Sequence, residues 1–200
     1  MASTIRELPE YVSLVIGWAL IVAAVSAPPW GFNLHRITAI SLGFMLHELM
    51  HRAVARKYGC FARYYLDPFG VLITVISLLL PIRFLAPGYV GIAMPPFLTP
   101  YEYKELSGKI AVSGPLMNIA LSLIGLIIVE LFKYRVILVP TIVLFFSVEL
   151  FIVNAWLALF NLIPLGPLDG AKVFKWSIVK WLIAFGMAVA LFMYSYRLLM

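Results

Sequence analysis

ITAISLGFMLHELMH, residues 37–51, places a His-Glu-x-x-His pattern directly after ten mostly apolar residues. On a helix, His47 and His51 lie four positions apart, so both imidazoles emerge from one face. Two neutral imidazoles at this spacing can bind one zinc ion, and Glu48 between them can take a proton from a water on the metal. The alternative for the motif alone is a structural pair of histidines whose hydrogen bonds are satisfied inside the fold.

The apolar run before the motif predicts how deep the two histidines lie in a membrane. Ten helical residues rise by roughly 15 Å, and the hydrocarbon core of a bilayer is about 30 Å thick. His47 and His51 are therefore expected between the midplane and the cytoplasmic boundary. Ionisable groups at this depth are costly and usually functional, which favours the metal interpretation.

The composition of the 200-residue chain is that of a membrane protein. Hydrophobic residues make up 64% of it and charged residues 12%, whereas soluble domains have about 45–50% and about 25%. The mean hydropathy is +1.02. A net charge of +6 would suggest nucleic acid as the partner of a soluble protein, but here the basic residues flank apolar runs. We therefore expect a lipid bilayer, and no nucleic acid, among the partners.

The apolar segments predict an all-α polytopic membrane protein, with a single domain over residues 1–200 and about five to six transmembrane helices. Four segments are long and apolar enough to cross a bilayer: 11–27, 37–54, 110–132 and 137–162. A fifth, 174–196, has Lys175 and Lys180 near its start. Region 68–100 is apolar but broken by prolines, so we expect a re-entrant element there, in the form of a short helix and a β-hairpin.

Basic side chains predict the orientation in the membrane. They gather at the end of the second segment and at the start of the last one: Arg52, Arg56, Lys57 and Arg63, then Lys172, Lys175 and Lys180. The positive-inside rule places both sites, and the N-terminus, in the cytoplasm. A single crossing by region 68–100 would put Lys172 outside, so that region is expected to return. The prediction is a multi-pass protein of the cell membrane whose active site opens toward the cytoplasm.

A catalytic zinc site needs a third protein ligand, and Asp169 is the candidate. His35 is expected in a loop, as an anchor at the membrane interface. Residues 161–170 read NLIPLGPLDG, and their two prolines and two glycines end the fourth segment in unwound backbone. The predicted topology returns this stretch to the cytoplasmic side, level with the histidines. The alternative is that Asp169 and Gly170 only form a turn.

Three motifs together resemble those of the site-2 protease family of intramembrane zinc metalloproteases. They are HELMH at 47–51, GPLMN at 114–118 and NLIPLGPLDG at 161–170. The resemblance extends from the second segment to the start of the last one. Two features depart from the family: Ala171 replaces a glycine that often follows Asp-Gly, and region 68–100 is longer and more apolar than in many members.

The resemblance implies a catalytic core at about residues 37–170, made of the three segments 37–54, 110–132 and 137–162. Segments 11–27 and 174–196 would flank this core. The resemblance further implies one zinc ion per chain. Its ligands would be His47, His51 and Asp169, and its general base Glu48.

Asparagines mark the helix faces expected to look into this site. Asn154 and Asn161 are seven residues apart and share nearly one face. Asn161 holds the family's asparagine position, eight before Asp169, where its amide could hold the scissile carbonyl or its oxyanion. Hydrogen bonding between helices is the alternative for both, and a structural role is favoured for Asn118. Glu149 points away from this face and has no assigned role.

Residues and resemblance together predict a zinc endopeptidase that cleaves transmembrane proteins or membrane-inserted peptides in regulated intramembrane proteolysis. An unpaired strand within region 68–100 could hold the unwound substrate by strand addition. Two alternatives stay open. One is a metal-binding membrane protein, or an ion or metal transporter, without hydrolytic activity. The other is an inactive homologue that binds membrane proteins.

Overall fold

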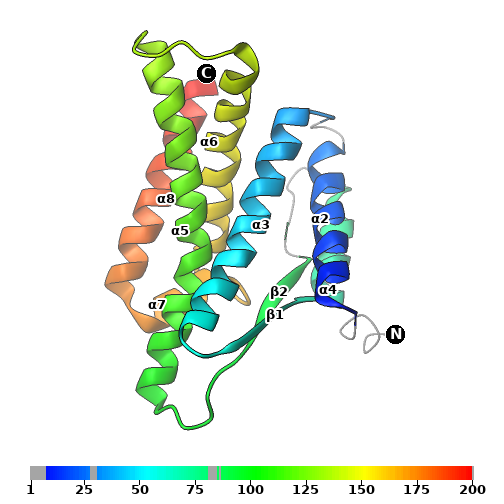
Figure 1. Ribbon diagram of the computed structural model, residues 1–200, viewed down its shortest axis with the longest axis vertical. Coiled ribbons are helices and arrows are strands. Elements are labelled where there is room, and N and C mark those ends of the chain that lie inside the picture. The colour runs from blue at the N-terminus through cyan, green and yellow to red at the C-terminus, as the bar shows by residue number, and fades with distance from the viewer. Residues whose placement is uncertain (1–7, 28–30, 81–84, 86, 200) are drawn as a thin grey trace.

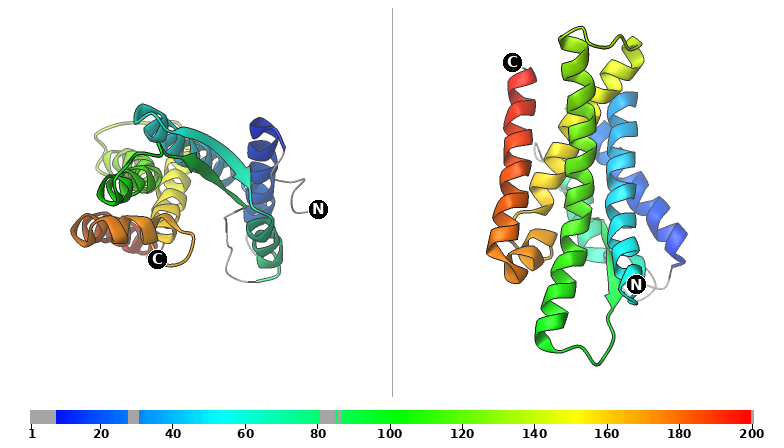
Figure 2. Two further views of the ribbon diagram at one scale, coloured as in Figure 1. Left: turned by 90° about the horizontal axis from the view of Figure 1, so that it is seen from below. Right: turned by 60° about the vertical axis from the view of Figure 1, so that its left-hand side comes forward.

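The computed structural model describes residues 8–27, 31–80, 85 and 87–199, which are mostly helical with one small sheet (Figure 1). Part of region 68–100, namely residues 81–84 and 86, lies outside the described residues. The elements form two groups that lie side by side (Figures 1 and 2). The candidate site lies where these groups meet.

Four long helices form the first group: α3 (Leu34–Lys57), α5 (Pro100–Lys133), α6 (Thr141–Asn161) and α8 (Ile178–Leu199). α5 packs most extensively on α6, and α3 packs on both. A glycine sets the closest approach, because a Cβ at Gly125 would lie 2.6 Å from the backbone nitrogen of Phe151. α5 begins at Pro100, well before the predicted residue 110, and a capping box of Thr99 and Glu102 fixes that start.

The second group contains α2 (Glu10–Ser26), β1 (Phe61–Leu66), α4 (Pro68–Ser77) and β2 (Gly88–Ala93). The strands pair antiparallel, with Tyr64 opposite Val90. β1 buries every second side chain, Ala62, Tyr64 and Leu66, as expected of a strand with one covered face. Figure 2 shows the strands running between α3 and the pair formed by α2 and α4. The sheet therefore continues the end of α3 that carries the HELMH motif.

The hairpin predicted within region 68–100 is wrong, although the short helix expected there is present as α4. β2 pairs with β1, which precedes the region, so α4 lies between the two strands in sequence. Asp67 begins α4, since its carboxylate accepts a hydrogen bond from the Gly70 nitrogen at 2.8 Å and Pro68 follows it. The helix predicted over 174–196 is present as α8, but its first residues belong to a separate short helix.

Two helices replace that predicted helix: α7 (Asp169–Trp176) and α8, separated by an extended Ser177. α7 is amphipathic, because Val173 is buried while its lysines lie outside the core. Lysines are costly on a lipid-facing helix, and Lys172 and Lys175 lie on α7, before α8 begins. Asp169 is consequently the first residue of a helix, and not part of unwound backbone as predicted.

Three of the described helices are both long and apolar enough to cross a membrane: Pro100–Lys133, Thr141–Asn161 and Ile178–Leu198. α2 is apolar but has only 17 residues. α3 has 24 residues but is less apolar, since it carries the polar residues of the HELMH motif and the basic residues after it. Of the five to six predicted crossings, length and composition therefore support three.

Candidate metal centre

Three side chains from two distant parts of the chain converge on one point. His47 and His51, on α3, are each 6% exposed, and their Nε2 atoms lie 3.0 Å apart. Asp169, 118 residues after His51, places Oδ2 at 3.0 Å from the Nε2 atom of His51 and 3.2 Å from that of His47. These are the three ligands predicted from the sequence, and the structure brings them together.

The turn between α6 and α7 delivers Asp169 to this point. A Cβ at Gly170 would collide with the carbonyl of Leu162, so only glycine lets α7 fold back against the end of α6. Gly166, within the turn, has a φ of 53°, a conformation that favours glycine. The Trp181 indole donates to the Leu162 carbonyl oxygen at 2.8 Å and ties α8 to the same turn. The glycines that end the fourth segment therefore position a ligand.

The Nδ1 atom of each histidine has a hydrogen-bond partner, which defines the tautomer of the neutral ring. His51 Nδ1 lies 2.8 Å from the Ile110 carbonyl oxygen, an acceptor only, so Nδ1 must carry the hydrogen. His47 Nδ1 lies 2.6 Å from Asn118 Oδ1. Asn118 Nδ2 donates to the Gly43 carbonyl oxygen at 3.2 Å, which fixes its Oδ1 as an acceptor. When the rings are neutral, both therefore present the lone pair of Nε2 to the cluster, whereas a protonated His51 donates from Nε2 to Asp169 Oδ2.

The cluster has the donor set and the space for a metal ion. With both rings neutral, two imidazole nitrogens and a carboxylate oxygen are all acceptors, and they would repel one another at 3.0–3.2 Å without a metal ion or a proton between them. Zinc bonds of 2.0–2.2 Å in a tetrahedron place ligand atoms about 3.3 Å apart. Gly114 on α5 keeps this space open, because a Cβ there would lie 2.5 Å from Nε2 of His51 and 2.7 Å from that of His47.

The charge state of Asp169 also suits a metal ligand. Burial of the carboxyl raises its pKa, but the neighbouring His51 and His47 rings outweigh burial and hold the pKa below the usual range of an aspartate. Asp169 is therefore ionised in this environment. Metal ligands must be deprotonated to bind, so no proton has to leave the carboxyl first.

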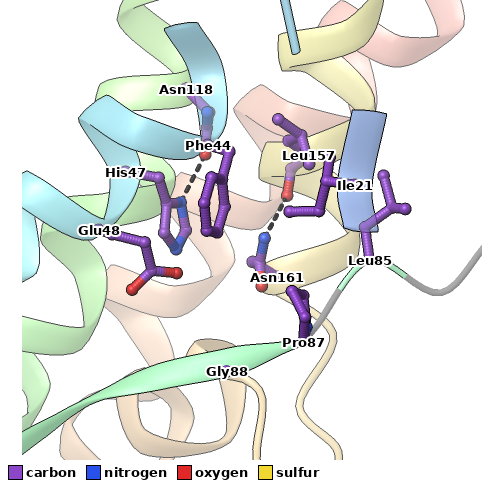
Figure 3. A pocket seen from close by; sticks show the side chains of 10 residues that line it. All are labelled: Ile21, Phe44, His47, Glu48, Leu85, Pro87, Gly88, Asn118, Leu157 and Asn161. Carbon is purple, nitrogen blue, oxygen red and sulfur yellow. Dashed lines mark hydrogen bonds between the residues drawn. The ribbon is translucent and has the colours of Figure 1, made fainter. Parts of the chain in front are cut away.

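Glu48 adjoins the cluster and faces a cavity of about 50 Å³ (Figure 3). α2, α3, α5, α6 and the segment entering β2 all contribute to its lining. Glu48 Oε2 is buried and has no hydrogen-bond partner among the described residues. A carboxylate left unpaired beside a metal site is placed to exchange protons with a molecule that enters the cavity.

The predicted asparagines separate into two positions. Asn161 lines the cavity, and its Nδ2 donates to the Leu157 carbonyl oxygen at 3.0 Å, which leaves a second amide hydrogen available. Asn154 is fully buried away from the cavity, where it accepts from Asn118 at 2.9 Å and donates to the Leu150 carbonyl oxygen at 2.9 Å. Of the two, only Asn161 can reach a molecule in the cavity.

Asn118 is the residue whose part in the site the sequence analysis missed. It was assigned a structural role, and it does join α5 to α3 and α6 through Gly43 and Asn154. It also bonds His47 directly. The sequence did hold a sign of this contact. Asn118 lies four residues after Gly114, so the two share one face of α5, and that face meets the histidines.

A second polar cluster lies at the opposite end of α3. Glu149 on α6 accepts from Arg36 at 3.1 and 3.2 Å and from Asn33 Nδ2 at 3.1 Å. This ion pair accounts for the glutamate that had no assigned role. His35, expected in a loop, lies in the first turn of α3, with its ring 5.9 Å from that of Phe145.

Curated relatives connect this geometry with an activity. "Putative zinc metalloprotease MJ0611" of Methanocaldococcus jannaschii is 36% identical over 178 residues, which cover 87% of each chain. "Zinc metalloprotease MJ0392" of the same organism is 33% identical over 131 residues, 66% of this chain and 30% of that protein. "Putative zinc metalloprotease YwhC" of Bacillus subtilis is 28% identical over 158 residues, 70% and 67% of the two chains. No family model and no solved structure matches. The extent of the first similarity shows that the chain belongs to this family of zinc metalloproteases.

Proposed function

We propose that the chain is an intramembrane zinc endopeptidase of the site-2 protease type, which hydrolyses peptide bonds in or near transmembrane segments. One observation carries the proposal: two imidazole nitrogens and a carboxylate oxygen converge beside Glu48, whose Oε2 has no hydrogen-bond partner among the described residues, within a bundle of apolar helices. A soluble substrate would not reach that bundle from water as easily as a membrane segment would from lipid. One zinc ion per chain is proposed.

His47, His51 and Asp169 would hold the metal, which supplies Lewis-acid polarisation of the scissile carbonyl and activation of water. Glu48 takes the proton of the attacking water and delivers it to the leaving amine. The free amide hydrogen of Asn161 donates to the carbonyl oxygen as negative charge develops there. Hydrogen bonds at both Nδ1 atoms keep the rings fixed during these transfers.

The edge of β2 offers a way to hold an unwound substrate. A transmembrane helix has its amides already bonded, so it must unwind before attack. The Asp67 nitrogen donates to the Pro87 carbonyl oxygen at 3.0 Å, and strand alternation then turns the N–H groups of Gly88, Val90 and Ile92 away from β1. Among the described residues, β2 pairs with β1 alone. An extended peptide can therefore add to the outer edge, beside Glu48.

The proposed setting is the cell membrane, crossed several times, with the N-terminus and the opening of the site toward the cytoplasm. Lysines and arginines at the end of α3 and in α7 support this orientation. The proposed partner is a transmembrane protein or peptide substrate in the lipid bilayer. Nucleic acid has no place in the proposal.

The decisive experiment compares the wild-type protein with Glu48→Gln, both purified in detergent and assayed on a set of single-span membrane substrates. We expect Glu48→Gln to retain one zinc per chain by elemental analysis and to lose cleavage by roughly 10²–10⁴-fold, the usual contribution of a general base. A metal transporter need not lose transport with this change. Unchanged cleavage in Glu48→Gln, or no zinc-dependent product from the wild type, contradicts the proposal.

A further inference from the structure

The cavity beside Glu48 has one polar side and one apolar side. Figure 3 shows the Phe44 ring above strand β2, with Glu48 on one side of it and Asn161 on the other. The polar side is formed by the groups assigned to the reaction. The apolar side comes from three helices and the segment before β2, through Ile21, Phe44, Leu85 and Leu157. A molecule that meets Glu48 must therefore also meet an aliphatic and aromatic wall.

The apolar wall belongs to a packed core and does not form a loose surface. Its four residues are between 1% and 8% exposed and share one hydrophobic cluster with Tyr64 and Leu66. Close-packed side chains resist displacement, so the wall sets a definite limit on what enters. A water needs roughly 10–15 Å³ of this kind of volume, so about 50 Å³ holds a few waters or one branched aliphatic side chain.

The charge of the lining further restricts the occupant. Among the described residues that line the cavity, Glu48 is the one acidic group and none is a lysine or arginine. An acidic side chain would be repelled by Glu48 and left without a counter-charge on the apolar side. A cavity of about 50 Å³ is small for a large aromatic ring, and the Phe44 ring already lies between Glu48 and Asn161.

We infer that this cavity is a specificity subsite that receives the aliphatic side chain of a residue directly flanking the scissile bond. The inference rests on the proposed proteolytic function, and it adds the substrate's side-chain class. Glu48 lines the cavity, so a side chain inside it belongs to a residue next to the reacting bond. A strand added along β2 would direct every second side chain to one face, where Gly88 lines the cavity. Phe44 sets the depth of the subsite.

The test is a series of otherwise identical membrane substrates with Ala, Val, Leu, Phe or Asp at each residue flanking the cleavage point. Mass spectrometry of the products gives kcat/KM for each. The wild type is expected to prefer Val or Leu over Phe and Asp by at least about tenfold at one of the two positions, as a closed apolar pocket dictates. Ratios between substrates do not depend on how much of the enzyme is folded.

Two changes to the wall should move this preference in opposite directions. Phe44→Leu deepens the cavity and should raise the ratio for Phe over Val about tenfold, while Leu157→Phe fills it and should favour Ala. Leu116→Ala is the matched control, since Leu116 is 43% exposed and lines a separate groove on α5. Its ratios should equal those of the wild type.

Two results would overturn the inference, and they are distinguishable. If the wild type cleaves but neither wall variant changes any ratio, the subsite is wrong and the proteolytic function stands. If the wild type cleaves no substrate in the series, with zinc bound, the proposed function fails and the subsite fails with it.

Discussion

The two ends of α3 bury polar groups in different ways. At the Arg36 end, Glu149 meets a guanidinium and an amide, so an anion is matched by donors. At the His47 end, two imidazole nitrogens and a carboxylate oxygen meet as three acceptors. The first cluster is complete with protein atoms alone, whereas the second needs a metal ion or an added proton between its acceptors. Burial of polar groups in a membrane helix is therefore a sign of function mainly where donors and acceptors do not balance.

The largest expected effect comes from removing one acceptor of the unbalanced cluster. His51→Ala leaves two ligands, so zinc content should fall from one per chain to a trace and cleavage should become undetectable. Arg36→Gln is the matched change at the balanced end and should leave zinc content unaltered. Elemental analysis of purified protein, before and after a chelator wash, measures both. An unchanged zinc content in His51→Ala would show that the cluster at His47 does not hold the metal.

Filling the space between the acceptors should have nearly the same effect without changing any ligand. In Gly114→Ala the added methyl group would stand 2.5 Å from His51 Nε2, where the cation belongs. We expect zinc binding to be lost while circular dichroism reports an unchanged helix content. Gly186→Ala is the control, because a Cβ there meets nothing within 4 Å. Normal zinc affinity in Gly114→Ala would show that the metal lies elsewhere.

A smaller effect is expected when a ligand loses its support. Asn118→Ala removes the acceptor that holds the Nδ1 hydrogen of His47. Loss of such a partner usually lowers metal affinity about 10–100-fold, so a competition titration with a zinc chelator should show that range. Ser122→Ala, one turn along α5 and bonded only to the Phe151 carbonyl oxygen, should leave the affinity unchanged. Equal affinities in the two variants would assign Asn118 a purely structural role.

The smallest effect is expected at the balanced end, and it concerns stability. Glu149→Gln removes the carboxylate charge that faces Arg36 in a partly exposed site, at a cost of about 1–3 kcal/mol in the free energy of unfolding. The apparent Tm should fall by roughly 3–10 °C. Zinc content and cleavage at low temperature should match the wild type. A loss of zinc in this variant would mean that the two ends of α3 are coupled.

The sequence predicted the parts of the molecule that follow from local pattern. Apolar runs located the long helices. The spacing of His47 and His51, together with the prolines and glycines that end a helix before Asp169, was sufficient to propose the ligand set. The β1–β2 pair was missed because the strands flank a helix, and their pairing depends on how α4 packs. The contact between Asn118 and His47 was missed because it depends on which face α5 turns toward α3. It also depends on a close approach of α5 to the two histidines, which Gly114 permits.

The separation of the ligands along the chain has a consequence for biosynthesis. Two of them are made early, within α3, but the third follows 118 residues after His51, at the start of α7. A nascent chain that has not yet extended past Asp169 holds an incomplete zinc site and has no hydrolytic centre. Under the proposed function, the chain is thus inert toward neighbouring membrane segments during insertion, and becomes competent only when α6 and α7 have folded against the helices made before them.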